Sequence, residues 1–109
     1  MKKEKYLYIW IDDVRPIPQK VKENFEHIMI AKDYQQAIHL LNTKEFQQDF
    51  YIIVDFDHDL GVGKTGYDIA KYIIENQIKI FRFLVHSTNP IGKFNIIQLL
   101  EHYGYIYFI

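Results

Sequence analysis

The sequence has no cysteine, and it holds only five glycines and three prolines among 109 residues. Without cysteine it has neither a disulfide framework nor a thiolate metal site, which fits a reducing compartment. No apolar run approaches the ~20 residues that a membrane-spanning helix needs, and the lysine-rich start leads into a run too short for a signal-peptide core. We therefore expect a soluble cytoplasmic protein with no membrane partner.

Charge of one sign is also scarce, because acidic and basic residues nearly balance to a formal net charge of -1. This balance argues against a protein that coats nucleic acid by bulk electrostatics, whereas a local phosphate site stays compatible with it. Apolar residues make up 49% of the chain and aromatic residues 17%, which is enough to build one core. The length is typical of a single domain, here residues 1–109.

Continuous apolar runs alternate with segments of helical periodicity along the chain. The runs at 6–11 and 51–56 show no polar alternation until they end in acidic residues, which is typical of strands buried on both faces of a parallel sheet. The predicted strands span residues 6–11, 27–31, 51–56, 80–85 and 105–109. The alternation predicts an α/β fold with three layers, in which helices cover both faces of a five-stranded parallel sheet.

The helices between these strands have recognisable starts. A short or irregular helix falls within residues 19–25, because two prolines precede it. Asp33 begins a helix that ends near residues 42–43, and Thr65 caps the next one. The last helix begins at Asn89-Pro90 or, if Gly92 delays it, at Lys93, and no helix follows the last strand. The predicted strand order is 2-1-3-4-5, as in flavodoxin-like and receiver-like folds.

Ionisable residues follow the first and third predicted strands, which are neighbours in this order. Ligands of open α/β sheets bind at this topological switch point, outside the carboxyl ends of the strands. We therefore expect residues that are distant in sequence to converge there. They are Asp12, Asp13, Asp57, His58 and Asp59, with His86, Ser87 and Asn89 arriving beside them from strand four.

Clustered carboxylates repel one another, so at neutral pH either some are protonated or a cation lies among them. Hard oxygen ligands favour a divalent metal ion, Mg²⁺ or Mn²⁺, held by Asp12, Asp13 and Asp57. The alternative is that some of these acids are solvated loop residues or helix caps. We expect Asp55 to be structural or to point to the opposite side of the sheet.

Two histidines, His58 and His86, are predicted at strand ends that face these acids. A neighbouring carboxylate can tune imidazole into a general acid or base near neutral pH, so both are candidate catalytic residues together with Asp57 and Asp59. Helix N-termini and cations attract phosphate. The candidate phosphate-binding residues are Arg15, Ser87, Asn89 and Lys93.

The acid pair Asp12-Asp13, the later Asp57 and Ser87 resemble the conserved positions of response-regulator receiver domains. The lysine-proline pair that receivers carry after strand five is missing. Four motifs resemble a divergent branch, the cyclic-phosphate-processing receiver domain, more closely. They are Ile11-Asp12-Asp13-Val14-Arg15-Pro16-Ile17-Pro18, Asp57-His58-Asp59-Leu60-Gly61, Thr65-Gly66-Tyr67-Asp68 and His86-Ser87-Thr88-Asn89-Pro90-Ile91-Gly92.

This resemblance implies a role on cyclic phosphates. The expected activity is that of a metal-dependent phosphoesterase whose substrate is an RNA end with a 2′,3′-cyclic phosphate or a cyclic nucleotide. Two alternatives stay open: a module that binds nucleotide or phosphate without turnover, and a degenerate receiver switch that is phosphorylated on Asp57. The missing lysine weakens the switch hypothesis.

Overall fold

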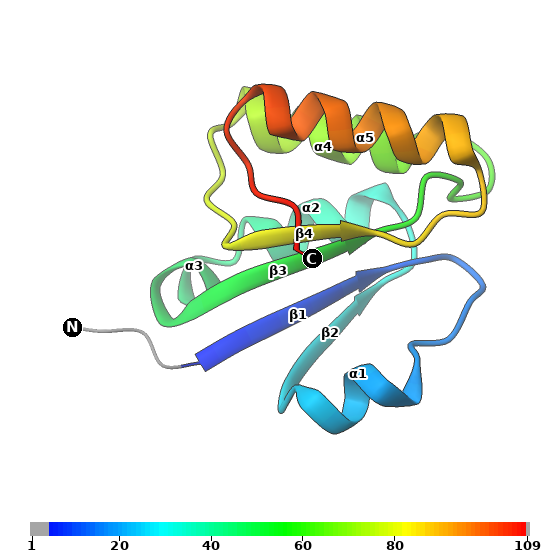
Figure 1. Cartoon of the computed structure of the whole chain (residues 1–109). Helices are drawn as coiled ribbons and strands as arrows, with labels where there is room; N and C mark the ends of the chain where they lie inside the picture. Colours follow the sequence, from blue (N-terminus) through cyan, green and yellow to red (C-terminus); the bar gives the residue numbers. More distant parts are fainter. Residues whose placement is uncertain (1–4, 109) are drawn as a thin grey trace.

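A computed structural model describes residues 5–108, and it shows four parallel strands with helices on both faces (Figure 1). The strands are β1 (Lys5–Ile11), β2 (His27–Ala31), β3 (Phe50–Phe56) and β4 (Arg82–Val85). Their order is β2-β1-β3-β4, and every pair is parallel. The predicted order of the first four strands is therefore confirmed, and β1 and β3 are neighbours at the switch point.

Five helices connect or follow the strands: α1 (Gln19–Asn24), α2 (Tyr34–Leu41), α3 (Lys44–Asp49), α4 (Gly66–Glu75) and α5 (Pro90–His102). The predicted caps are present, since the side chain of Asp33 accepts a hydrogen bond from the backbone of Gln36, and Thr65 and Asp68 form a capping box. Helix α3 was not predicted. No helix within residues 5–108 is long and apolar enough to cross a membrane.

The predicted fifth strand is wrong for the described part of residues 105–109, and Ile109 lies outside that part. Only Tyr107 pairs with β4, through an isolated parallel bridge to Phe83. The backbone of Phe83 bonds Ile106 and Phe108 on either side of this bridge, so the segment touches β4 at one point and does not extend a ladder. The hydroxyl of Tyr105 is meanwhile held by the carbonyl of Ile78, 2.8 Å away.

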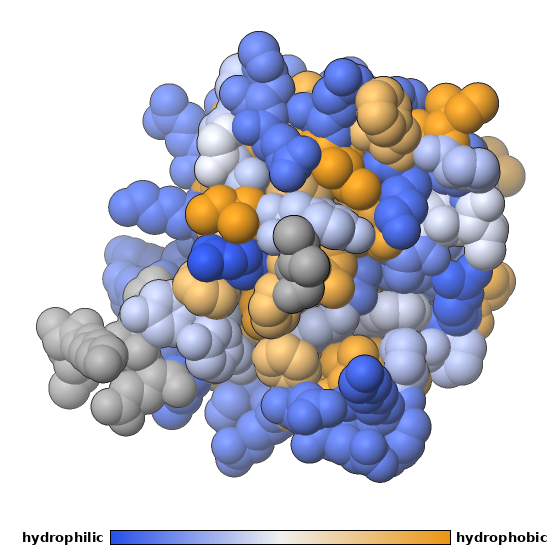
Figure 2. Space-filling view, in the orientation of Figure 1, coloured by the Kyte–Doolittle hydropathy of each residue, from blue (hydrophilic) through white to orange (hydrophobic). Residues whose placement is uncertain are grey.

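Two hydrophobic clusters lie on opposite faces of the sheet. The larger one includes Ile9, Val54 and Phe83 from the strands and packs under α2, α4 and α5. The smaller one centres on Tyr8, Trp10, Ile17 and Ile53, and α1 packs against it. Figure 1 shows α1 alone on its face, below β1 and β2. Hydrophilic residues cover the lower end of Figure 2, where α1 lies.

The carboxyl ends of β1, β3 and β4 open at one edge of the sheet. The backbone continues the pairing beyond the strands, because Asp57 donates to the carbonyl of Ile11 and His86 donates to the carbonyl of Phe56. These bonds hold the first residues after each strand in register. The acidic and histidine-bearing segments therefore meet at this edge, as the switch-point argument predicts.

Candidate functional site

Asp12 is the first residue after β1, and it is almost fully buried at 2% exposure. Its Oδ1 accepts hydrogen bonds from the backbone N–H groups of Val14 and Arg15, at 2.9 and 2.7 Å. An aspartate that bonds the backbone two and three residues later stabilises a turn. This turn leads the chain away from the sheet and leaves Oδ2 facing the neighbouring strands.

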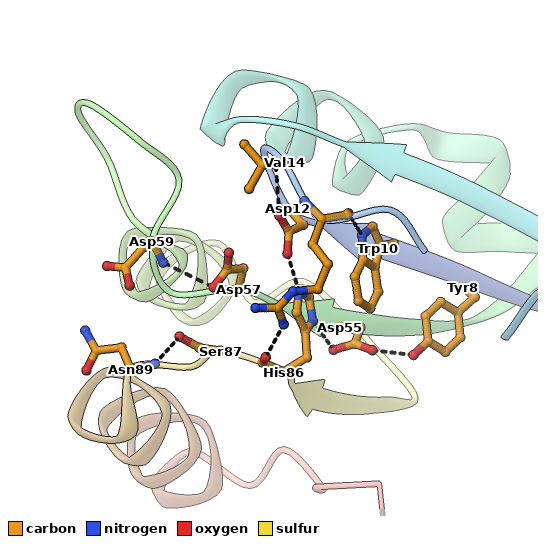
Figure 3. A network of polar contacts seen from close by, with 11 residues as sticks. Tyr8, Trp10, Asp12, Val14, Asp55, Asp57, Asp59, His86, Ser87 and Asn89 are labelled. Atoms are coloured by element: carbon orange, nitrogen blue, oxygen red, sulfur yellow. Dashed lines mark hydrogen bonds and ion pairs between the residues drawn. The ribbon is translucent and has the colours of Figure 1, made fainter. Parts of the chain in front are cut away.

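The ring of His86 is held between two carboxylates from different strands (Figure 3). Its Nδ1 lies 2.7 Å from Oδ1 of Asp55, and its Nε2 lies 2.9 Å from Oδ2 of Asp12. The ring also stacks on Trp10, with centroids 3.8 Å apart and planes 7° apart. The hydroxyl of Tyr8 donates to the other oxygen of Asp55. These contacts form a buried polar chain across β1, β3 and β4, Tyr8–Asp55–His86–Asp12.

The two carboxylates set the charge of His86. Burial alone would lower the pKa of the imidazole, but the hydrogen bonds and negative charges of Asp55 and Asp12 outweigh burial and raise it. Burial likewise acts against ionised Asp12, yet the backbone N–H groups of Arg15 and Val14, together with His86, hold the pKa of this carboxyl below its ordinary value. Each ring nitrogen of His86 faces a carboxylate oxygen at hydrogen-bond distance, and the imidazolium form donates to both.

Asp57 contributes a further buried carboxylate to the same edge. Burial, and then the negative charge of Asp12, raise the pKa of Asp57, although His86 and a hydrogen bond with Ser87 act in the other direction. Asp12, Asp57 and His86 each offer one ligand atom, and these atoms lie within 4.8 Å of one another. The predicted approach of Asp12 to Asp57 across adjacent strands is therefore present.

The carboxylate oxygens of this cluster are suitable ligands for a divalent cation. Asp12 and Asp57 supply hard carboxylate ligands, and a cation would offset their mutual repulsion. His86 can join as a ligand only after losing the Nε2 proton that bonds Asp12. Asp13, which the sequence placed in the metal set, lies outside this group of three and is only half-buried.

The expectation that Asp55 points to the side of the sheet opposite the site is wrong. Residues two apart on a strand share a face, so Asp55 and Asp57 project to the same side of β3. The register places Asp55 beside Trp10 on β1 and Leu84 on β4. The same spacing signal would have placed Asp55 on the side of Asp57, whereas its bonds to His86 and Tyr8, and the stacking of Trp10 on His86, depend on the strand register and were missed.

His58 lies apart from this chain of contacts. Its Nδ1 is 3.0 Å from Oδ1 of the exposed Asp59, and its side chain is 20% exposed. The ring packs beneath the start of α5, where a Cβ on Gly92 would come within 2.4 Å of its Cγ. The prediction that histidines face the buried acids is therefore confirmed for His86. The described hydrogen bond of His58 instead runs to the exposed Asp59.

Gly66 lets the loop after β3 return close to its own start. Its backbone N–H donates to the carbonyl of His58 at 2.8 Å, and a Cβ there would lie 2.0 Å from the carbonyl oxygen of Asp57. Only glycine fits such a close approach of backbones. Thr65 then caps α4, and the loop from Asp57 to Thr65 is fixed at both ends.

The four predicted phosphate-binding residues lie at or near this edge in different settings. Arg15 is exposed, and its Nη1 donates to the carbonyl of His86 at 2.9 Å. The Oγ of Ser87 accepts from the backbone of Asn89, and Asn89 caps α5 by accepting from the backbone of Gly92. Lys93 is half-buried in the first turn of α5. The helix therefore begins at Pro90, and Gly92 does not delay it.

Comparison with known protein families gave one match, which spans most of the chain. The matching family model is described as the cyclic-phosphate processing receiver domain and covers residues 7–102. These residues include β1 through α5 and every member of the buried polar chain. Searches of curated proteins and of solved structures found no significant match.

Proposed function

Because the chain belongs to the family of cyclic-phosphate-processing receiver domains, we propose that it hydrolyses a cyclic phosphodiester at the carboxyl edge of its sheet. The substrate is a nucleotide with a cyclic phosphate or an RNA end with a 2′,3′-cyclic phosphate. The observation that carries this proposal is the ring of His86, held between Asp55 and Asp12 beside the buried carboxylate of Asp57.

Opening a cyclic phosphodiester requires an attacking water, a proton for the leaving oxygen and positive charge near the non-bridging oxygens. Without a bound cation Asp57 is the candidate base, because burial and Asp12 raise its pKa and so strengthen its affinity for a proton; with a cation bound, this carboxylate would be a ligand rather than the base. His86 carries a proton on the nitrogen that faces Asp12, which makes it the candidate acid. Asp55 and Tyr8 hold the ring in place from behind.

Arg15 supports phosphate binding at the same place. Its guanidinium reaches across the edge to the carbonyl of His86, and its remaining donors are available to phosphate oxygens. Ser87, Asn89 and Lys93 at the start of α5 provide further donors next to Asp57. In this proposal His58 and Asp59 form a second, more exposed pair of titratable side chains, which assists Asp57 and His86 in proton transfer.

Asp12 and Asp57 would hold the divalent cation, Mg²⁺ or Mn²⁺. When bound, such an ion neutralises the carboxylates and polarises a phosphoryl oxygen. The cation fits this place because the buried carboxylate oxygens of Asp12 and Asp57 approach each other, with the ring of His86 beside them.

The test is incubation of the protein with a panel of cyclic mononucleotides, cyclic dinucleotides and RNA ends with 2′,3′-cyclic phosphate, with and without Mg²⁺ or Mn²⁺. Chromatography of the products should show a linear phosphomonoester or a linear dinucleotide for at least one substrate. His86→Gln should reduce turnover about 10²–10⁴-fold, while His39→Gln on α2 serves as the matched control. Tight retention without turnover would instead identify a binding module, and stable labelling of Asp57 by a phosphodonor would identify a switch.

A further inference from the structure

The face of the sheet that carries α1 is only partly covered. Helix α1 packs against Tyr8 and Trp10, and no helix among residues 5–108 lies over β3 and β4 on that side (Figure 1). The uncovered part begins with Tyr6 and Tyr51, which are side by side in the register of β1 and β3. Tyr6 is 41% exposed.

Three aromatic rings form a triangle on this uncovered part. The ring centroids of Tyr6 and Tyr51 are 5.4 Å apart, those of Tyr6 and Phe81 are 5.5 Å apart, and those of Tyr51 and Phe81 are 5.1 Å apart. The guanidinium of Arg82 lies over Phe81, 4.2 Å from the centroid. We call these four residues the aromatic platform. A hollow of about 560 Å³ adjoins it at Phe81, which is one of the residues that line that hollow.

The platform is continuous with the candidate site. Arg82, Leu84 and His86 alternate along one face of β4, and Leu84 belongs to the cluster that contains Trp10. His86 is four residues after Arg82, a distance of about 13 Å at 3.3 Å per residue. Successive phosphates along one strand of a duplex are about 3.4 Å apart in the axial direction, so a few nucleotides of RNA are enough to span this distance.

The charges along this path complement a polyanion. Arg15 lies exposed above His86 at one end, and Arg82 lies beside Phe81 at the other. Between the platform and His86 the acidic residue is Asp55, which is buried at 4% exposure and pairs with His86. The carboxylates of Asp12 and Asp57 lie at the His86 end, where the cation of the proposed function would offset their charge. The path therefore carries aromatic rings and two arginines, the combination that holds bases by stacking and phosphates by charge, with the half-buried Leu84 between them.

We propose that the aromatic platform binds the bases of single-stranded RNA, so that its 3′ end reaches the carboxyl edge of the sheet. This inference rests on the proposed function, which supplies the cyclic phosphate at the reacting 3′ end. It narrows the substrate class from any cyclic phosphate to the end of an oligonucleotide. Stacking on aromatic rings tolerates every base, so the platform selects single-stranded RNA over a lone nucleotide without reading its sequence.

The test measures binding of a fluorescein-labelled single-stranded RNA with a 3′-hydroxyl by fluorescence anisotropy. This RNA has no cyclic phosphate, so its binding does not depend on hydrolysis. The wild-type protein should bind it saturably, and Tyr6→Ala should weaken binding about 5- to 150-fold, the effect of losing one stacked base. Tyr6→Phe keeps the ring and should bind nearly as well as the wild type.

Phe94→Ala is the matched control, because Phe94 is an exposed ring on α5, outside the platform. Equal weakening by Phe94→Ala and Tyr6→Ala would overturn the proposal, as would an absence of saturable binding by the wild type. Amide chemical shifts of the wild-type protein, titrated with the same RNA, make the result independent of any folding defect in a variant. Shifts should cluster at Tyr6, Tyr51 and Phe81, and shifts confined to other surfaces would refute the platform.

The outcomes also separate this proposal from the proposed function. RNA that binds the platform while no cyclic phosphate is opened contradicts hydrolysis and leaves the platform standing. Hydrolysis of cyclic mononucleotides without binding of the RNA contradicts the platform and leaves hydrolysis standing. Self-association that Tyr6→Ala abolishes, without any RNA binding, would identify the surface as a contact between two copies of the chain and overturn the proposal.

Discussion

Replacing Asp55 with asparagine tests whether Tyr8, Asp55 and His86 act as one buried unit. The carboxylate accepts a hydrogen bond from Tyr8 on one oxygen and from the protonated Nδ1 of His86 on the other. In asparagine one of these acceptors becomes an NH₂ group, so one donor loses its partner. Asp55 is 4% exposed, so water does not readily replace the lost acceptor.

The expected loss of stability follows from these contacts. A hydrogen bond to a charged group contributes about 1.5–3 kcal/mol, and a buried donor left without an acceptor costs about 1–3 kcal/mol. Asp55→Asn should therefore lower the free energy of unfolding by about 2–3 kcal/mol. Tyr8→Phe removes the hydroxyl that donates to the same carboxylate and should lower it by about 1.5–3 kcal/mol.

Urea denaturation of the wild type, both single variants and the double variant measures the coupling between the two residues. Trp10 is the single tryptophan and stacks on His86, so its fluorescence reports unfolding at the site. Residues in one hydrogen-bond network show coupling energies of about 0.5–3 kcal/mol. Additive losses, with coupling below about 0.3 kcal/mol, would refute the reasoning that the chain of contacts is a unit.

Two further predictions concern how the elements around the site are held. The backbone N–H and hydroxyl of Thr65 hold the pKa of the Asp68 carboxyl below its ordinary value. Ionised Asp68 therefore stabilises the fold at pH values above its unfolded pKa of about 3.9. This contribution to stability is lost as the pH falls through the lower pKa of the folded state. In urea titrations at several pH values, Asp68→Asn should remove that part of the pH dependence, and an unchanged profile would contradict it. Gly92→Ala should destabilise the protein by about 1–3 kcal/mol, because the added Cβ would overlap the ring of His58. If this overlap is the cause, the double variant with His58→Ala should regain stability. An unaltered melting temperature in Gly92→Ala would count against the contact.

The sequence predicted the parallel sheet and the convergence of its acidic ends, because both follow from strong local signals. Runs such as 51–56 have no polar alternation, and the order of the first four strands brings Asp12 beside Asp57 by topology alone. The caps at Asp33 and Thr65 were equally local, since each side chain bonds a backbone group three residues later.

The failures have non-local causes. Residues 105–108 have strand-like composition, but Phe83 bridges only Tyr107, while the hydroxyl of Tyr105 bonds the carbonyl of Ile78 instead. Helix α3 lacks an N-cap side-chain bond and fully buried residues, so it carries little periodic signal. The hydrogen bond between Asp55 and His86 joins residues 31 positions apart, and only the register of β3 and β4 reveals it.

The most direct test of the central claim is phosphorus NMR of a mixture of 2′,3′-cyclic and 3′,5′-cyclic nucleotides and a short RNA ending in a 2′,3′-cyclic phosphate, with Mg²⁺ and Mn²⁺ present. Reactions with Mn²⁺ are freed of the ion by chelation before the spectrum is recorded, because paramagnetic Mn²⁺ broadens phosphorus resonances. With the wild-type protein, at least one cyclic-phosphate resonance should be replaced by that of a phosphomonoester, and the replacement should slow about 10²–10⁴-fold in His86→Gln. Cyclic-phosphate resonances that persist with the wild type, or that disappear equally fast with His86→Gln, would contradict the assignment of cyclic-phosphate hydrolysis to this edge of the sheet.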